Sequence, residues 1–157
     1  MALGVTHILT VHDKGKAHFP NYFEYLIIPI CDQHHVNIST HFKDAHQFIR
    51  KAHELSGTVF VHCWAGMSRS ATMVISYLMQ REQISFAQAY HIFSDAKPDI
   101  SPNPGFVFQM KQFQQQIGIQ DEPGNKKGQA QGASNGKKYG ASSSNGQGID
   151  LGISQPD

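Results

Sequence analysis

The chain has 157 residues, a formal net charge of +1, 39% apolar residues and 16% charged residues. This length predicts one domain and a tail, with enough apolar residues for a core in part of the chain. The balanced charge argues against a strongly basic nucleic-acid-binding protein, and no apolar run is long enough to cross a bilayer. Residues 1–4 contain neither a signal-peptide core nor a myristoylation glycine at position 2, so no membrane anchor is expected.

Two cysteines, Cys31 and Cys63, are too few for a secreted disulfide framework. The reducing cytoplasm or the nucleus is therefore the expected location. The ten histidines raise the question of a metal, but no C-x-x-C pair or H-E-x-x-H helix accompanies them. We therefore expect no metal and no other cofactor.

The first predicted elements are two strands and a helix. Residues 5–11 form a β-branched and apolar run that ends at a turn signal, and residues 25–30 form a second run. Pro29 limits the second strand because proline has no backbone donor. Residues 40–55 keep the apolar period of an amphipathic helix. Ser39 or Thr40 is expected to cap its start and Gly57 to provide its exit.

The second half of the predicted domain has one strand and three helices. Residues 58–62 read as a short buried strand, and residues 69–80 as a central helix that is apolar almost all round. Residues 85–88 resemble a capping box that opens a helix to about residue 95. Asn103 followed by Pro104 predicts the start of a last helix, which ends near residue 117. Strands separated by helices predict an α/β domain whose central sheet is largely parallel and flanked by helices.

The composition changes near residue 118. Residues 118–157 are rich in Gly, Ser, Gln and Asn and contain one aromatic residue. Such a segment cannot bury enough apolar surface to offset its ordering entropy, so it is predicted to be a disordered tail. The domain is therefore expected to span residues 1–117.

The most informative stretch joins the strand at 58–62 to the helix that begins at Arg69. Its backbone N–H groups can form an anion-binding nest that the helix N-terminus completes, and Gly66 can adopt angles that a Cβ forbids. Arg69 offers a planar fork of donors that suits two phosphate oxygens. The residues predicted to bind the substrate phosphate are Trp64, Ala65, Gly66, Met67, Ser68 and Arg69.

The same surroundings predict a reactive thiol at Cys63. Helix N-termini and nearby positive charge lower a thiol pKa from about 8.5 to roughly 3.5–7.5, which makes the thiolate available for attack on phosphorus. The loop donors and Arg69 would stabilise the transition state, and no metal is needed. The alternative is that Cys63 is a small core residue and Arg69 a helix cap. That alternative fits each residue alone but not the whole strand–loop–helix pattern.

The pattern His62-Cys63-x5-Arg69-Ser70 resembles the signature of the protein tyrosine phosphatase superfamily. The sequence of residues 65–72 is most similar to the dual-specificity branch of this superfamily, and the resemblance covers about residues 5–117. It implies a protein phosphatase that hydrolyses phosphotyrosine and phosphoserine or phosphothreonine through a phosphocysteine intermediate. Because residues 64–68 lack the lysines often found in phosphoinositide phosphatases of this kind, phosphoproteins are the implied substrates. The sequence makes no prediction of oligomeric state.

The resemblance also implies roles for individual residues. Asp32 stands at the family's general-acid position, although it also fits a simple turn residue. Ser70 matches the hydroxyl that helps the cysteine leave when the intermediate is hydrolysed. His62 is implied to orient the loop, and Ser68 to position the loop or Arg69. Asn103 either ties a neighbouring loop to the site or only caps the last helix, and the cap is favoured.

The family domain normally has further strands and a helix before the strand at residues 5–11, so the N-terminal part of the domain is expected to be missing. One alternative function is therefore a pseudophosphatase that binds phosphoproteins without turnover, since a displacement of about 1 Å can cost 10²-fold in rate. A rhodanese-type sulfur transferase is a weaker alternative. Cys31 is expected to be a buried free thiol, with a protective disulfide to Cys63 as the less favoured possibility.

Overall fold

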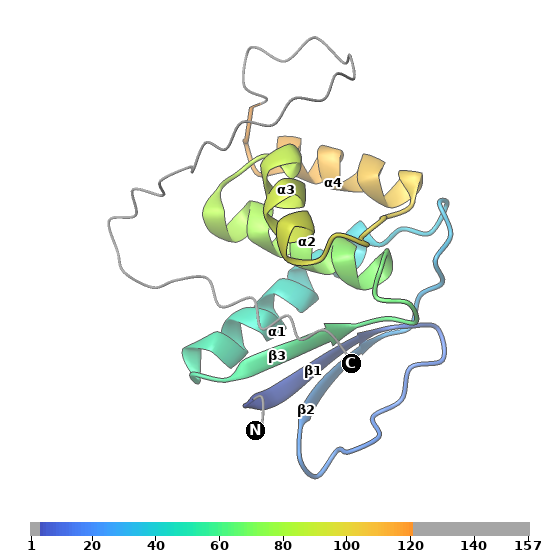
Figure 1. The fold of residues 1–157 in the computed structure, drawn as a ribbon, viewed down its shortest axis with the longest axis vertical. Coiled ribbons are helices and arrows are strands. Elements are labelled where there is room, and N and C mark those ends of the chain that lie inside the picture. Colours follow the sequence, from blue (N-terminus) through green and yellow to red (C-terminus); the bar gives the residue numbers. More distant parts are fainter. Residues whose placement is uncertain (1–3, 121–157) are drawn as a thin grey trace. The chain divides into compact units, whose positions relative to one another are not determined.

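The computed structural model describes residues 4–120, so the predicted tail from residue 121 onward lies outside the described residues. The described part combines three strands with four α-helices, as expected for an α/β domain (Figure 1). The predicted boundary at residue 117 stays a prediction, with the last helix ending one residue before it. In chain order the elements are β1 (Val5–Val11), β2 (Glu24–Ile28), η1 (Ser39–His41), α1 (Phe42–Glu54), β3 (Thr58–His62), α2 (Arg69–Glu82), α3 (Phe86–Ala96) and α4 (Pro104–Gln116).

The strands form a parallel sheet in the order β2-β1-β3. Leu9 in the central strand pairs with Leu26 of β2 and Val61 of β3. Parallel strands buried in an α/β domain are typically continuous apolar runs, which explains why β1 reads that way in the sequence. The prediction of a parallel central sheet is confirmed. The second strand stops before Pro29, as the missing backbone donor requires.

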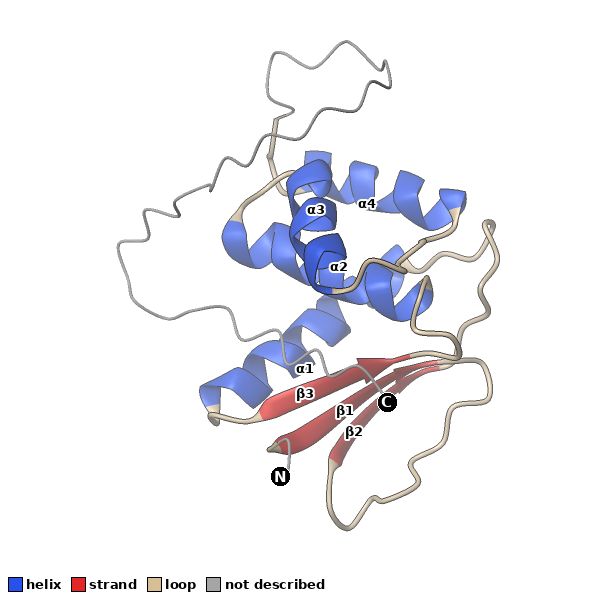
Figure 2. Ribbon diagram, viewed as in Figure 1, coloured by secondary structure: helices blue, strands red, loops and turns tan. Residues whose placement is uncertain are grey.

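All four α-helices lie on one side of the sheet in the ribbon view (Figure 2). Helices α1 and α2 contact β1 and β3 directly, and α3 and α4 pack against α2. Leu9 and Val11 are completely buried. The segment between β1 and β2 approaches the sheet closely, because a Cβ on Gly15 would lie 2.9 Å from the Thr10 side chain and 3.0 Å from that of Ile27.

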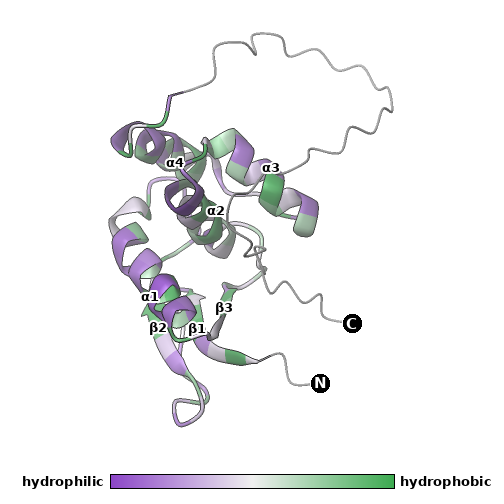
Figure 3. Cartoon of the chain, turned by 90° about the vertical axis from the view of Figure 1, so that its left-hand side faces the viewer, coloured by the Kyte–Doolittle hydropathy of each residue, from purple (hydrophilic) through white to green (hydrophobic). Residues whose placement is uncertain are grey.

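The start and end of α1 differ from the predicted caps. A short 3₁₀ turn precedes the helix, and His41, which makes no side-chain cap, takes the N-cap position. The expected capping hydroxyls are engaged elsewhere: Ser39 Oγ donates to Asn37 Oδ1, and Thr40 Oγ1 donates to Asn37 O. At the other end Ser56, rather than Gly57, has the left-handed conformation, with φ 55°. The helix is amphipathic as predicted and carries hydrophilic and hydrophobic residues along its length (Figure 3).

The caps of α3 and α4 are as predicted. Ser85 and Gln88 form a capping box, with the Gln88 N–H donating to Ser85 Oγ and the Ser85 N–H donating to Gln88 Oε1. Asn103 caps α4 by accepting a hydrogen bond from the Phe106 N–H at 3.0 Å. Between residues 4 and 120, no helix has the length and apolarity needed to cross a membrane.

Candidate active site

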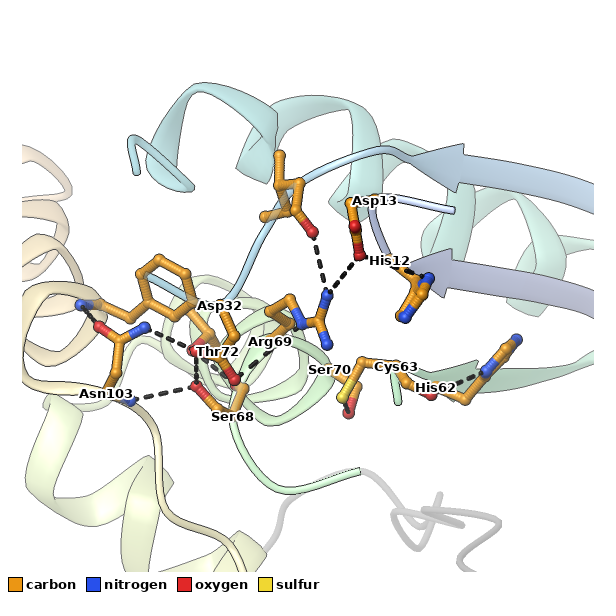
Figure 4. Close-up of polar contacts among 12 residues, drawn as sticks. His12, Asp13, Asp32, His62, Cys63, Ser68, Arg69, Ser70, Thr72 and Asn103 are labelled. Carbon is orange, nitrogen blue, oxygen red and sulfur yellow. Dashed lines mark hydrogen bonds and ion pairs between the residues drawn. The ribbon is translucent and has the colours of Figure 1, made fainter. Parts of the chain in front are cut away.

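The predicted site residues gather where the three parallel strands end. The loops that follow β1, β2 and β3 carry Asp13, Asp32 and Cys63, respectively. The carboxyl ends of parallel strands lie at one edge of a sheet, which is where ligands bind in open α/β folds. Figure 4 shows these residues around the guanidinium of Arg69.

The loop from Cys63 to Ser68 connects β3 directly to α2. Gly66 has a φ of 69°, in the left-handed region that favours glycine, as predicted. Arg69 is the first residue of α2, so the loop ends at a helix N-terminus as predicted. In the first turn, the Thr72 N–H and Oγ1 both donate to Ser68 O at 2.9 Å. These bonds hold the end of the loop on the helix.

Cys63 is half-buried, and its Sγ lies 3.2 Å from Ser70 Oγ. Burial alone would raise the pKa of the thiol. The Ser70 hydroxyl, the backbone N–H groups of Ser70 and Gly66, and the charge of Arg69 outweigh burial, so the pKa of Cys63 is lowered overall. Three predicted site residues therefore act on the thiol together.

Arg69 is only 7% exposed, and its Nη1 donates to Ile30 O at 3.1 Å. The same nitrogen lies 3.5 Å from Asp13 Oδ1, while Nε lies 4.0 Å from Asp32 Oδ2. Nε is buried and has no hydrogen-bond partner among the described residues. A buried donor without a partner costs free energy, so this nitrogen is available for an anion that enters the site.

Asp32 is held by one of its two oxygens. Its Oδ1 accepts hydrogen bonds from Ser68 Oγ and from Asn103 Nδ2, both at 2.7 Å. Its Oδ2 faces Arg69. These contacts join Asp32 to Ser68, Asn103 and Arg69, and Oδ2 is the carboxylate oxygen that neither Ser68 nor Asn103 binds.

Asn103 serves both of the roles that the sequence left open. Its Oδ1 caps α4, and its Nδ2 binds Asp32. Its backbone N–H also donates to Ser68 Oγ at 3.1 Å. The preference for a cap alone was therefore wrong, because one amide side chain can accept with its oxygen and donate with its nitrogen.

His62 and Trp64 flank the nucleophile in the chain. His62 Nε2 lies 2.9 Å from Thr10 Oγ1, and its Nδ1 lies 3.3 Å from Cys63 O, which fits the predicted orienting role. Burial lowers the pKa of His62, and so the ring is neutral near pH 7. Trp64 is 82% exposed and stacks on His12 with ring centroids 5.6 Å apart, so it lies at the surface and not beneath the loop.

The remaining loop residues contribute backbone. Ala65 is exposed, and Met67 is 39% exposed. Met67 O accepts a hydrogen bond from the Ser101 N–H at 2.8 Å, which ties the loop to the segment before α4. The role predicted for them in phosphate binding would come from their N–H groups, since neither side chain has a strong donor.

Cys31 is exposed, and the prediction of a buried thiol was wrong. It lies beyond the end of β2, after Pro29 has stopped the strand, where the chain leaves the sheet. Among residues 4–120, no group of three or more His, Cys, Asp or Glu side chains is placed to hold a metal ion.

Two partners of Arg69 were missed by the sequence reasoning. One is the backbone oxygen of Ile30, which no side-chain pattern can reveal. The other is Asp13, whose place in the sequence predicted only a turn after the first strand. The sequence could have indicated Asp13, because it follows β1, which pairs in parallel with β3, and parallel strands bring their carboxyl ends together.

Comparison with known proteins identifies the family. The model of the dual specificity phosphatase catalytic domain matches residues 1–116. The chain belongs to the dual-specificity phosphatase family. It is 38% identical over 116 residues to dual specificity protein phosphatase 4 of Gallus gallus, a match that covers 74% of this chain and 31% of that protein. Identity to dual specificity protein phosphatase 1 of Mus musculus is also 38%, over 74% of this chain and 32% of the relative.

The fold of this family member agrees with solved structures. The crystal structure of human tyrosine phosphatase-like serine/threonine/tyrosine-interacting protein matches with a TM-score of 0.68 and 32% identity, over 71% of this chain and 78% of that one. The chain thus spans about a third of the length of the two curated relatives (31% and 32%). It spans 78% of the chain in the human crystal structure.

Proposed function

We propose that this dual-specificity phosphatase domain hydrolyses phosphotyrosine and phosphoserine or phosphothreonine in proteins through a phosphocysteine intermediate. The observation that carries the proposal is the buried Nε of Arg69, which has no partner among the described residues. Arg69 stands at the start of α2, and its charge also helps to lower the Cys63 pKa. A guanidinium with a free donor beside a thiolate suits a phosphoryl group and its three equatorial oxygens.

In the first step the Cys63 thiolate attacks phosphorus and forms an S–P bond while the bond from phosphorus to the ester oxygen breaks. Asp32 gives its proton to the departing oxygen, and Oδ2 is the atom that its hydrogen bonds leave for this role. Arg69 and the N–H groups of the loop hold the charge on the equatorial oxygens.

In the second step water attacks the phosphocysteine and loses a proton to Asp32. The S–P bond breaks, orthophosphate leaves and the thiolate returns. Ser70 Oγ, 3.2 Å from Sγ, can donate a hydrogen bond to the sulfur as negative charge develops on it. This contact supports a role for Ser70 in the hydrolysis of the intermediate.

We further propose that the protein acts on signalling phosphoproteins in the cytoplasm or nucleus. Both cysteines in the described part of the chain are free. A reducing compartment would support this function because it keeps the catalytic thiolate from oxidation.

The direct test is to measure the hydrolysis of a small aryl phosphate in the presence of a metal chelator. We expect Cys63→Ser to abolish turnover, and Asp32→Asn to lower kcat by roughly 10²-fold, because a positioned acid typically contributes 10²–10⁴. Cys31→Ser is the matched control, since Cys31 is an exposed thiol with no role in the proposed steps. It should retain full activity.

Orthovanadate should inhibit the native chain, and rapid acid quenching should trap a phosphorylated enzyme that Cys63→Ser cannot form. Tight phosphopeptide binding by a folded sample without any product release would contradict the proposal. It would then favour a binding module.

A further inference from the structure

Two carboxylates from different loops lie near the guanidinium of Arg69. Asp13 Oδ1 lies 3.5 Å from Nη1, and Asp32 Oδ2 lies 4.0 Å from Nε (Figure 4). Asp32 has a role in the proposed mechanism, whereas that mechanism makes no use of Asp13. The nearer of the two carboxylates therefore has no assigned function.

The geometry of Arg69 does not depend on Asp13. Nη1 is already held by the Ile30 carbonyl at 3.1 Å, which is a well-formed hydrogen bond. The contact of the same nitrogen with Asp13, at 3.5 Å, is at the long limit for a hydrogen bond. The contribution of Asp13 is consequently its charge.

Within 4 Å, Asp13 forms ion pairs only with Arg69 and His12 among residues 4–120. His12 Nδ1 lies 3.5 Å from Asp13 Oδ1, but it accepts a hydrogen bond from the Lys14 N–H at 3.0 Å. A ring nitrogen that accepts this hydrogen bond cannot at the same time donate one to the carboxylate, which leaves Arg69 as the side chain that donates to Asp13.

In the ligand-free protein this charge is stabilising. Arg69 is 7% exposed, and a buried cation is costly unless a counter-ion is near. Asp13 is the closer of the two counter-ions that the described residues provide. When a phosphate dianion binds Arg69 it takes over this role, and Asp13 is left beside a group of its own sign.

We propose that Asp13 is the counter-ion of Arg69 in the ligand-free protein. Its charge stabilises the fold when no phosphate is bound and weakens the binding of phosphate. The inference rests on the proposed function of Arg69 as the phosphate ligand. It assigns Asp13 as a residue that sets the affinity for the substrate phosphate, without contact with the reacting atoms.

The test compares Asp13→Asn with the native chain. Asparagine keeps the shape and one acceptor oxygen but removes the charge. We expect the inhibition constant of inorganic phosphate to fall by roughly three- to tenfold, as for one unit charge a few ångströms away in a partly hydrated site. KM should fall with it and kcat should change little, because the charge acts on bound substrate and transition state alike.

The ligand-free variant should unfold at a lower temperature, by about 2–5 °C, because the buried Arg69 guanidinium loses the nearer of its two counter-ions, although Asp13 itself is exposed. The gain in phosphate affinity should shrink at high salt. Asp13→Ser, which removes the same charge with a smaller side chain, should change both quantities in the same direction. Glu54→Gln is the matched control, because it removes an exposed carboxylate whose partner is Arg50 on the surface of α1.

The same comparison in a Cys63→Ser background, by calorimetry with inorganic phosphate, does not depend on turnover. If the native chain fails to hydrolyse aryl phosphates, the proposed function is wrong, and this measurement still decides the role of Asp13. Weaker phosphate binding in Asp13→Asn would overturn the inference and make Asp13 a positioning residue. Unchanged binding, or an unchanged unfolding temperature, would also overturn it.

Discussion

Ser70 is the side chain that acts most directly on the nucleophile. Its hydroxyl lies 3.2 Å from Cys63 Sγ and is the largest of the contributions that lower the thiol pKa against the opposing effect of burial. Ser70 is itself 4% exposed, so water cannot readily replace its hydrogen bond. The protonation of Cys63 should therefore respond to this one hydroxyl.

We predict that Ser70→Ala raises the Cys63 pKa. The thiolate is lost as pH falls through that pKa, so the midpoint of both alkylation and kcat/KM should move to higher pH in the variant. The measurement is the rate of iodoacetamide labelling of Cys63 against pH. Ser94→Ala, which removes an exposed hydroxyl on α3, is the control. A midpoint that stays in place or moves to lower pH would contradict the role given to Ser70.

Residues close together in the chain were predictable from the sequence, and those joined only by the fold were not. Cys63, Gly66 and Arg69 lie in one loop, so their spacing already predicts an anion site. Asp32 depended on family resemblance, because it reaches the site through Ser68 and Asn103, 36 and 71 residues away. Asp13 arrives through strand pairing, which no local pattern specifies.

At the level of elements, the position of each periodic segment was predicted correctly, and most errors fell at segment ends. The α2 helix follows from its hydrophobic pattern, which reflects burial over many residues. The strand at residues 58–62 forms where predicted, but it is only half-buried and Phe60 is 48% exposed, so the prediction of a buried strand was wrong. The cap of α1 was predicted wrongly because Ser39 and Thr40 both bind Asn37. Ser39 donates to the Asn37 side chain and Thr40 to the Asn37 backbone oxygen, so one neighbouring residue that accepts from both hydroxyls is enough to move the cap.

The first turn of α4 is packed against the segment that follows Asp32. A Cβ built on Gly105 would lie 1.9 Å from the backbone oxygen of His34, a contact that no side-chain rotation can relieve. Because Asn103 both caps α4 and binds Asp32, this contact also affects the distance between the helix and the proposed general acid.

We predict that Gly105→Ala lowers both stability and activity. The added methyl must push α4 away from residues 33–36, and overpacking of this kind costs about 1–3 kcal/mol in the free energy of unfolding. Urea unfolding and kcat measure the two effects. Gly118→Ala is the control: its φ of 76° strains the backbone, but a Cβ there meets nothing within 4 Å. An equal loss of kcat in the two variants would mean that the close packing has no link to Asp32.

At the level of the whole domain, one histidine outside the proposed active site, His46, is buried in the core. His46 is 6% exposed, with Nδ1 2.5 Å from Gln80 Oε1 and Nε2 2.9 Å from Ser76 Oγ. Its ring stacks on Phe42. Burial lowers the pKa of His46 from 6.5 to about 4, against the opposing effect of the hydrogen bond to Gln80 Oε1 and with a further decrease from the charge of Arg50.

This shift makes the stability of the domain depend on pH. The folded state keeps His46 neutral, while the unfolded chain takes up a proton below about pH 6.5. The stabilisation is thus complete above the unfolded pKa and is lost progressively as pH falls toward the folded pKa of about 4. From about pH 7 to about pH 5 the expected loss is about 2 kcal/mol, since each pKa unit is worth about 1.4 kcal/mol.

We predict that His46→Gln removes most of this loss, because glutamine does not titrate and can still donate to or accept from Ser76 and Gln80. Urea unfolding at the two pH values measures the difference within each variant, so any overall destabilisation by the substitution cancels. His91→Gln removes an exposed histidine paired with Asp95 and should keep the native pH dependence. If the native chain and His46→Gln lose the same free energy of unfolding between the two pH values, the acid sensitivity comes from other groups. Two candidates are His53 and His62, whose pKa values are also lowered.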